Sequence, residues 1–304
     1  MPTLTLAHSA DADDVFMWWP ITGKVSASAP HEVIAPACID TRGWSFRALP
    51  ADIQDLNKRA IDVGDLDITA VSFSAYPHIR TRYALTSCGS SFGKGYGPKL
   101  VAKPSRALAS PSDLEGLRVG VPGLNTSAFL TLSALVGAGR FTPVPTPFDR
   151  IIERVVSGEV DAGVVIHEGQ LMFARAGLKL VADLGAWWTQ QRSMPLPLGA
   201  NAVRRDLDAR FGPGSMRTVV ALLRASIDHA LAHRDEALDY AATFSPLKER
   251  SELDRYVSMY VNDLTVDAGE SGASAVRALL AAGVESGVLP DSETFEFVSP
   301  DMGK

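Results

Sequence analysis

The 304-residue sequence predicts an α/β protein with two lobes around a central cleft and a helical C-terminal segment. Short apolar runs alternate with segments of helical period, a pattern typical of α/β proteins with largely parallel sheets. From Ser215 onward the helical pattern continues with no convincing strand. A repeat within the first two-thirds of the chain indicates the two lobes.

Hydrophobic periodicity locates the individual elements. The predicted strands are Leu4–Ala7, Asp67–Phe73, Lys99–Ala102, Arg118–Val121, Ala162–Ile166 and Leu178–Val181. The predicted helices between them are Ala51–Asp62, Thr126–Val136 and Arg150–Ser157. The predicted C-terminal helices are Arg217–His233, Glu249–Val261 and Ala273–Ser286.

Two similar stretches lie about ninety residues apart. In each, an amphipathic helix ends at a glycine, which tolerates the left-handed C′ position, and an apolar strand follows. Polar side chains lie at the carboxyl end of each strand: Ser72 in the first stretch and His167 in the second. Similar polar turns follow the strands at Ala7–Ser9 and Val121–Ser127. Ligands of open α/β sheets bind at the carboxyl ends of strands, so we expect these side chains to face a cleft.

Two segments rich in glycine or proline are the expected crossings between the lobes. The outward crossing is Tyr96–Lys103 and the return is Pro195–Ala200. Lobe one would then comprise residues 1–102 plus 197–304, and lobe two residues 103–196, which is the layout of bilobal solute-binding proteins. The alternative is two contiguous domains with a boundary near Pro104. The run Gly89–Pro98 lacks the Gly-Lys-Ser/Thr ending of a phosphate-binding loop, so we interpret it as a hinge or a cleft-lining loop.

The composition excludes several classes of partner and location. Lys and Arg number 29 against 35 Asp and Glu, with no basic block, so nucleic acid is not an expected partner. Cys38 and Cys88 are too few for a disulfide framework and lack metal-ligand spacing. The N-terminus has no basic region before its short apolar run, and no run approaches the ~20 residues of a membrane span. We therefore expect a cytoplasmic protein with no membrane insertion; the oligomeric state is left open.

His167 is the strongest candidate for catalysis. It leaves the end of an apolar strand, and histidine titrates near neutrality, as a general base must. The alternative is a structural histidine that caps the strand. His229 and His233 are one helical turn apart and are expected on a solvated face, while His31 and His78 lie in predicted loops.

Three acids follow Ser9: Asp11, Asp13 and Asp14. An EF-hand calcium loop is excluded, because its glycine and glutamate positions are occupied by Phe16 and Thr22. The favoured interpretation is the start of a helix, with Asp at the cap and in the first turn. A role in the cleft is compatible with that, and we expect Ser9 and Asp14 to contact hydroxyl groups of a ligand.

Thr126 and Ser127 begin a predicted helix directly after Gly123. Free N–H groups and hydroxyls at a helix N-terminus form an anion site, for which a carboxylate is the natural guest. Ordinary N-capping is the alternative and does not exclude it. Trp187 and Trp188 are interpreted either as the wall of an aromatic pocket or as simple packing.

Six segments, in order, resemble one enzyme family. They are Ser72–Tyr76, Gly93–Pro98, Val121–Ala128, Ile166–Glu168, Asp183–Trp188 and Pro195–Ala200. They resemble the MqnA/MqnD family of menaquinone biosynthesis, and within it the 1,4-dihydroxy-6-naphthoate synthases of the futalosine route. The resemblance extends from Ala7 to about residue 290 and includes Tyr260–Asn262.

The resemblance implies a periplasmic-binding-protein fold of type II used as an enzyme, with no metal and no organic cofactor. The implied reaction splits cyclic dehypoxanthine futalosine, a carboxylate-bearing spiro compound, into 1,4-dihydroxy-6-naphthoate and dihydroxyacetone. The family's histidine base corresponds to His167. Its substrate-contacting stretches correspond to Ala70, Val71 and Ser72, and to Thr126 and Ser127.

The sequence departs from the family pattern at several pocket positions. The family's Ser-Pro-Cys-Pro-Asn-Asp is Ser9-Ala-Asp-Ala-Asp-Asp14 here, and its Ser-Phe-His-Ala-Tyr has Ser74 in place of histidine. Ser127 replaces the second threonine of Thr-Thr. Two alternatives to the synthase are the chorismate dehydratase of the same fold and a non-catalytic solute-binding module for an aromatic carboxylate.

Overall fold

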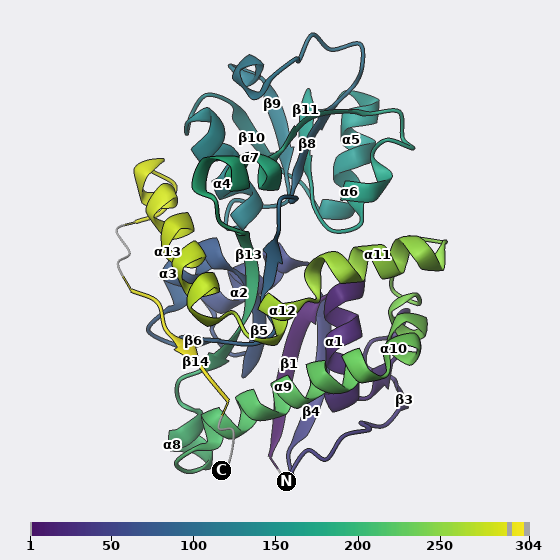
Figure 1. The fold of residues 1–304 in the computed structure, drawn as a ribbon, viewed down its shortest axis with the longest axis vertical. Helices are drawn as coiled ribbons and strands as arrows, with labels where there is room; N and C mark the ends of the chain where they lie inside the picture. Colours follow the sequence, from purple (N-terminus) through teal and green to yellow (C-terminus); the bar gives the residue numbers. More distant parts are fainter. Residues whose placement is uncertain (1, 291–293, 301–304) are drawn as a thin grey trace.

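The computed structural model describes residues 2–290 and 294–300 and contains two large β-sheets, each covered by helices (Figure 1). We call each sheet and the helices packed on it a lobe. Residues 1, 291–293 and 301–304, which the predicted first lobe includes, lie outside the described residues.

The first lobe contains a seven-stranded sheet in the order β14-β6-β13-β5-β1-β4, with β7 paired to β13. Its strands are β1 (Thr3–Ser9), β4 (Ser45–Ala51), β5 (Ile68–Ser72), β6 (Tyr83–Thr86), β7 (Ser91–Gly93), β13 (Leu196–Arg204) and β14 (Phe297–Val298). Strand β1 runs parallel to both β4 and β5, and Ser9 pairs with Ala51 at its end. A separate pair, β2 (Lys24–Val25) and β3 (Val33–Ala35), lies outside this sheet.

The second lobe contains a five-stranded sheet in the order β10-β9-β11-β8-β12. Its strands are β8 (Lys99–Ala102), β9 (Arg118–Val121), β10 (Thr142–Pro145), β11 (Ala162–Val165) and β12 (Lys179–Asp183). Its helices are α4 (Ser127–Val136), α5 (Ile151–Ser157), α6 (Gly169–Met172), α7 (Leu184–Arg192) and the short turns η2 (Pro111–Leu114) and η3 (Phe148–Arg150).

Two expectations about these sheets are wrong. The boundary after residue 102 misplaces β8, because main-chain hydrogen bonds join β8 to β11 and β12, so the crossing precedes Lys99. The sheets are also less parallel than expected, since β8 and β13 enter their sheets directly from the other lobe and pair antiparallel with their neighbours. The remaining predicted boundaries of the lobes stay a prediction.

The helices of the first lobe pack around α1 and along the sheet (Figure 1). They are α1 (Ala12–Thr22), α2 (Ile53–Asp62), η1 (Phe73–Ala75), α3 (Tyr76–Ile79), α8 (Leu207–Phe211), α9 (Ser215–Ala232), α10 (Arg234–Ala241), α11 (Arg250–Tyr260), α12 (Asp263–Val266) and α13 (Gly269–Glu285). Every residue of α1 is buried, because α9, α10 and α11 surround it. Within residues 2–290 and 294–300, no helix is both long and apolar enough to cross a bilayer.

The strands of the predicted repeat have the predicted arrangement. Strands β1 and β5 of the first lobe, and β9 and β11 of the second, all end at one cleft, and the residues that follow them line it. The glycine that ends α5, Gly158, has φ of 88° in the left-handed region, as the C′ position requires. The two halves of the repeat therefore face each other across the ligand site.

At Gly97 the outward crossing lies against Gly185 at the start of α7 and against the Leu196 side chain of the return crossing. A Cβ atom on Gly185 would lie 1.9 Å from the carbonyl oxygen of Tyr96, which is backbone and cannot rotate away. Glycine is required there because the outgoing chain and the start of α7 make direct backbone contact. This contact holds the outward crossing against the second lobe.

We predict that Gly185→Ala destabilises the fold by more than about 2 kcal/mol, the scale of overpacking a rigid contact. Gly120→Ala is the matched control, because its Cβ would lie 3.4 Å from Val160, an ordinary contact. Urea denaturation of both variants measures the difference. If Gly185→Ala and Gly120→Ala lower the free energy of unfolding equally, the backbone around Gly185 and Tyr96 relaxes without cost and the prediction is wrong.

Candidate active site

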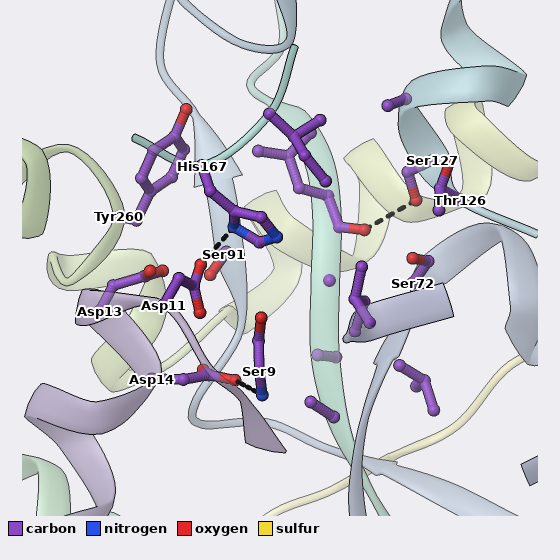
Figure 2. A pocket seen from close by; sticks show the side chains of 18 of the residues that line it. Ser9, Asp11, Asp13, Asp14, Ser72, Ser91, Thr126, Ser127, His167 and Tyr260 are labelled. Carbon is purple, nitrogen blue, oxygen red and sulfur yellow. Dashed lines mark hydrogen bonds and ion pairs between the residues drawn. The ribbon is translucent and has the colours of Figure 1, made fainter. Parts of the chain in front are cut away.

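A cavity of about 690 Å³, its open mouth included, lies between the two lobes. All of the sequence-predicted site residues line it, and Figure 2 shows most of them with their side chains directed inward. They are Ser9, Asp14, Ala70, Val71, Ser72, Thr126, Ser127 and His167. Among the described residues that line the cavity there is no Lys or Arg.

His167 follows β11 and enters the cavity from the second lobe (Figure 2). Its backbone has φ of 50°, a left-handed conformation that is uncommon outside glycine. Its Nδ1 forms an ion pair with Oδ2 of Asp11 in the first lobe. The Phe148 ring packs edge-on against the imidazole, with 4.7 Å between ring centroids. The other ring nitrogen, Nε2, is buried and has no hydrogen-bond partner among the described residues.

The charges of this pair stabilise each other. Burial alone would lower the pKa of His167, but the charge and the hydrogen bond of Asp11 raise it to about 9. Burial would likewise raise the pKa of Asp11, but His167 holds it well below its usual range. The pair is therefore imidazolium and carboxylate at neutral pH.

Asp13 lies behind Asp11 and is in the opposite protonation state. Burial and the neighbouring charge of Asp11 raise the pKa of Asp13 well above its usual value. The Tyr256 hydroxyl lies 2.9 Å from Oδ1 of Asp13 and 3.1 Å from Oδ2 of Asp11. The pKa of Tyr256 is itself raised, by burial first, so the phenol stays protonated and can donate. Asp13 is thus neutral beside an ionised Asp11.

The start of α1 does not follow the expected capping pattern. Asp11 occupies the N-cap position, but its side chain makes no capping hydrogen bond because it is turned toward His167. Asp14 instead reaches back, and its Oδ2 accepts from the N–H of Ser9 at 2.7 Å. Burial and the charge of Asp11 raise the pKa of Asp14 to about 7. The cluster therefore does more than initiate the helix.

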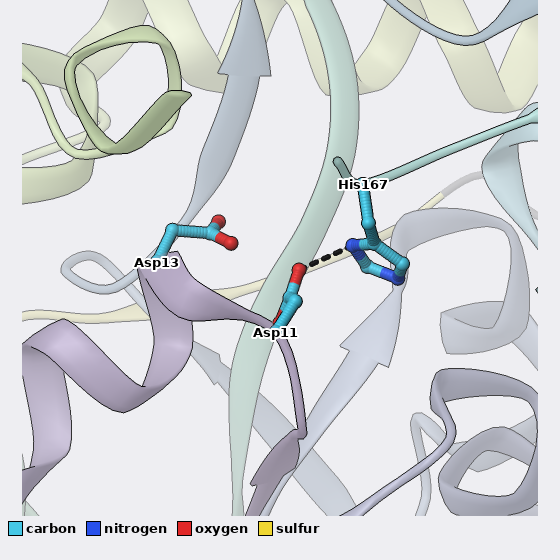
Figure 3. A group of neighbouring side chains, drawn as sticks. All are labelled: Asp11, Asp13 and His167. Carbon is cyan, nitrogen blue, oxygen red and sulfur yellow. Dashed lines mark ion pairs between the residues drawn. The ribbon is translucent and has the colours of Figure 1, made fainter. Parts of the chain in front are cut away.

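Asp11, Asp13 and His167 bring three potential metal-ligand atoms within 4.8 Å of one another (Figure 3). Their chemistry argues for a hydrogen-bonded network. Nδ1 of His167 is already paired with Asp11, and Oδ1 of Asp13 accepts from the Tyr256 hydroxyl. We therefore assign no metal to these residues.

The opposite side of the cavity is formed by the start of α4. The Thr126 hydroxyl donates to the carbonyl of Gly123 at 2.7 Å and accepts from the N–H of Phe129 at 3.2 Å, so it is an N-cap. The Ser127 hydroxyl donates to the Leu198 carbonyl at 2.7 Å (Figure 2). Both hydroxyls are thus engaged within the protein. The cap satisfies the N–H of Phe129, whereas the N–H groups of Ser127 and Ala128 have no hydrogen-bond partner among the described residues and could receive an anion.

Hydrogen bonds join the lobes on both sides of the cavity. On one side, Oε1 of Glu168 accepts from the N–H of Ala12 at 3.3 Å and from the Ser245 hydroxyl at 3.0 Å. On the other side, the carbonyl of Asn125 accepts from the Ser74 hydroxyl at 2.6 Å and more weakly from Asn57. The two lobes are therefore in direct contact on both sides of the cavity.

Some lining residues were not expected from the sequence. Tyr260 donates to Oε1 of Gln170 at 2.8 Å, across the lobes. Tyr256 and Tyr260 are four residues apart on α11 and therefore lie on the same face of the helix. This spacing is the sequence feature from which their place in the site could have been predicted. Trp188 is fully buried in a hydrophobic core cluster and does not line the cavity. Of the two interpretations given for the tryptophan pair, simple packing is therefore the correct one for Trp188.

Comparisons with known proteins identify the family. Residues 4–285 match the family model described as menaquinone biosynthesis. The chain belongs to this family. A relative from Thermus thermophilus, named 1,4-dihydroxy-6-naphthoate synthase, is 37% identical over 98% of this chain and 100% of its own length. That relative is thus named as an enzyme.

Solved structures show the fold of this menaquinone-biosynthesis family member. A protein from Archaeoglobus fulgidus is 36% identical and has a TM-score of 0.79, covering 94% of this chain and 98% of its own. A Candida albicans protein with the generic periplasmic-binding-protein fold has a TM-score of 0.68 at 11% identity, with both chains fully covered. The predicted bilobal periplasmic-binding-protein fold is confirmed.

We predict that Asp14→Asn changes how stability depends on pH. The pKa of Asp14 is about 7 in the folded protein and near 3.8 when unfolded, so folding takes up a proton between these values. This contribution is complete below pH 4 and is lost as the pH rises to 7. Asp14→Asn should not lose this stability. Its free energy of unfolding, relative to that of the wild type, should therefore increase by more than about 1 kcal/mol between pH 4 and pH 8. Denaturant titrations at each pH measure it.

Asp65→Asn is the contrasting control, because the hydrogen bond from Arg59 lowers the pKa of this exposed carboxyl. Asp65→Asn should change the pH dependence of stability only slightly. The sign should be opposite to that of Asp14→Asn, because the pKa of Asp65 is lowered by folding and that of Asp14 is raised. If Asp14→Asn shows the wild-type pH dependence, the Asp14 carboxyl is ionised throughout.

Proposed function

We propose that this protein is a 1,4-dihydroxy-6-naphthoate synthase, a carbon–carbon lyase that acts on cyclic dehypoxanthine futalosine. The products would be 1,4-dihydroxy-6-naphthoate and dihydroxyacetone. The name of the Thermus thermophilus relative supports this reaction, as does its near-complete coverage of the chain. The observation that carries the proposal is the buried, unpartnered Nε2 of His167 in the cleft.

In the proposed reaction, the neutral form of His167, which predominates above its pKa of about 9, uses Nε2 to remove the proton from a hydroxyl of the sugar-derived part. The oxygen lone pair then forms a carbonyl, and the adjacent carbon–carbon bond breaks in a retro-aldol sense. The electron pair of that bond passes into the ring system, which becomes the aromatic naphthoate. Aromatisation absorbs the developing charge, so the base needs only correct placement and protonation state.

The two sides of the cavity suggest how such a substrate lies. Three acids are on the side of His167, and the N-terminus of α4 is on the other. A carboxylate is favoured at the helix N-terminus, where N–H groups and the helix dipole are positive. Hydroxyl groups can donate to carboxylates such as Asp11. We therefore infer that the naphthoate carboxylate faces Thr126 and Ser127 and the sugar carbons face His167.

We predict that His167→Gln lowers turnover by the ~10²–10⁴ typical of losing a general base. Glutamine keeps much of the size and a polar end but cannot accept the proton, so binding should change far less. The wild-type rate should rise with pH through an ionisation near 9, because the pKa of His167 is raised to about 9. This rise should be missing from the residual activity of the variant.

Mass spectrometry of wild-type protein incubated with the cyclic substrate tests the reaction directly. Binding of the substrate without formation of either product would identify a solute-binding module and refute the synthase. Near-normal turnover of a folded His167→Gln variant would remove this residue from the mechanism.

We predict that Thr126→Val lowers stability by about 0.5–2 kcal/mol, the value of an N-cap. The change should alter product binding little, since the hydroxyl is committed to Gly123 and Phe129. Thr126→Ser keeps the cap and is the matched control. Urea denaturation and calorimetric titration with 1,4-dihydroxy-6-naphthoate separate the two effects. Weaker binding at unchanged stability would place the hydroxyl on the ligand.

A further inference from the structure

Asp11 and His167 form a dyad whose two members come from different lobes. Asp11 precedes α1 in the first lobe, and His167 follows β11 in the second. We propose that Asp11 is a positioning residue, which holds the proton of neutral His167 on Nδ1 and thereby leaves Nε2 as the basic atom that faces the substrate. This inference rests on the proposed function and adds a residue to it.

The geometry supports this role in two ways. A neutral imidazole carries one proton, and the nitrogen that keeps it is set by the hydrogen bond it makes. Oδ2 of Asp11 is an acceptor at Nδ1, whereas Nε2 has no partner in the part of the chain that the structure describes. The tautomer with a free lone pair at Nε2 is therefore favoured, as in the serine-protease triad.

The local structure also shows that Asp11 is held for this purpose. Asp is among the best N-cap residues, and Asp11 occupies the N-cap of α1, yet its carboxylate makes no cap. It is buried, with 4% of its surface exposed, and the Tyr256 hydroxyl lies 3.1 Å from the same oxygen. The left-handed backbone of His167 and the edge of Phe148 fix the imidazole from the other side.

The placement of the dyad makes the basic group dependent on cleft closure. Asp11 and His167 belong to different lobes, which are connected covalently only through the two crossings. Nδ1 of His167 can therefore reach Oδ2 of Asp11 only when the lobes are in contact. Glu168, the next residue, accepts from the N–H of Ala12 and so aligns the two chain segments. An open cleft would leave the imidazole without its carboxylate, and the base would be complete only around enclosed substrate.

The pH dependence follows from all charges that face His167. Of these charges, Asp11 raises the pKa of His167 most, and Glu168 and Asp52 raise it further. Asp14 is also coupled to His167 through space. Without the Asp11 charge, burial is the largest remaining influence and it favours neutral imidazole. Removal of that charge should therefore move the ionisation to lower pH.

The test compares the pH–rate profiles of wild type, Asp11→Asn and His167→Gln. For Asp11→Asn we expect turnover to fall at least tenfold, toward the ~10⁴ seen when a triad loses its carboxylate. Its remaining rate should reach a plateau at least one pH unit below that of the wild type. A merely structural role would lower the rate without moving the ionisation.

Asp67→Asn is the matched control, because it also removes a buried carboxylate, one that accepts from Thr5 and does not line the cavity. It should leave the ionisation in place. Normal turnover and an unmoved ionisation in Asp11→Asn, with His167→Gln inactive, would overturn the role of Asp11 alone. An active His167→Gln would instead overturn the proposed function.

Nitrogen-15 NMR of the wild-type protein tests the tautomer without relying on the Asp11 variant. The protein has six histidines, and the signals missing from His167→Gln assign those of His167. Above its ionisation, the His167 proton should reside on Nδ1. A neutral form with the proton on Nε2 would refute the proposal even if the Asp11 variant fails to fold.

Discussion

The closed cleft depends on an ion pair that neither lobe could maintain alone. A buried carboxylate or imidazolium is costly without a partner, and here Asp11 and His167 come from different sheets. Burial raises the pKa of both Asp13 and Asp14, and the Asp11 charge raises both further. The Asp11–His167 pair can form only where the two lobes meet.

The fold explains why these side chains meet. Four strands of the two sheets end at the same cleft, so short polar turns after them converge without any long loop. The crossings reinforce this arrangement, because β8 and β13 continue from one lobe directly into the sheet of the other. At Gly97 the outward crossing lies against Gly185 of α7 and against Leu196 of the return crossing. Both links between the lobes therefore enter a sheet directly as strands.

Much of this architecture could be predicted from periodicity, because β8 and β9 have the predicted bounds and α4 differs by one residue. Strand β13 was missed, since its prolines and glycine indicated a connection, although it pairs with three neighbouring strands. The pairing of Asp11 could not be predicted from its neighbours in the sequence. An Asp before a helix predicts an N-cap, whereas the partner of Asp11 is His167, which lies far along the chain. For Thr126, by contrast, the local cap was correct and the hydroxyl is not free for a ligand.

Asp11 and Asp13 place two acids beside His167, yet they add little net charge to the cavity wall. His167 balances the Asp11 carboxylate, and burial favours the neutral form of Asp13. A cavity that lacks Lys and Arg among its described lining residues would repel an anion if all its acids were ionised. With the charges arranged this way, the proposed carboxylate substrate meets an almost neutral wall and a positive helix terminus. Asp11 therefore raises the pKa of His167 more than it changes the net charge that the proposed substrate would meet.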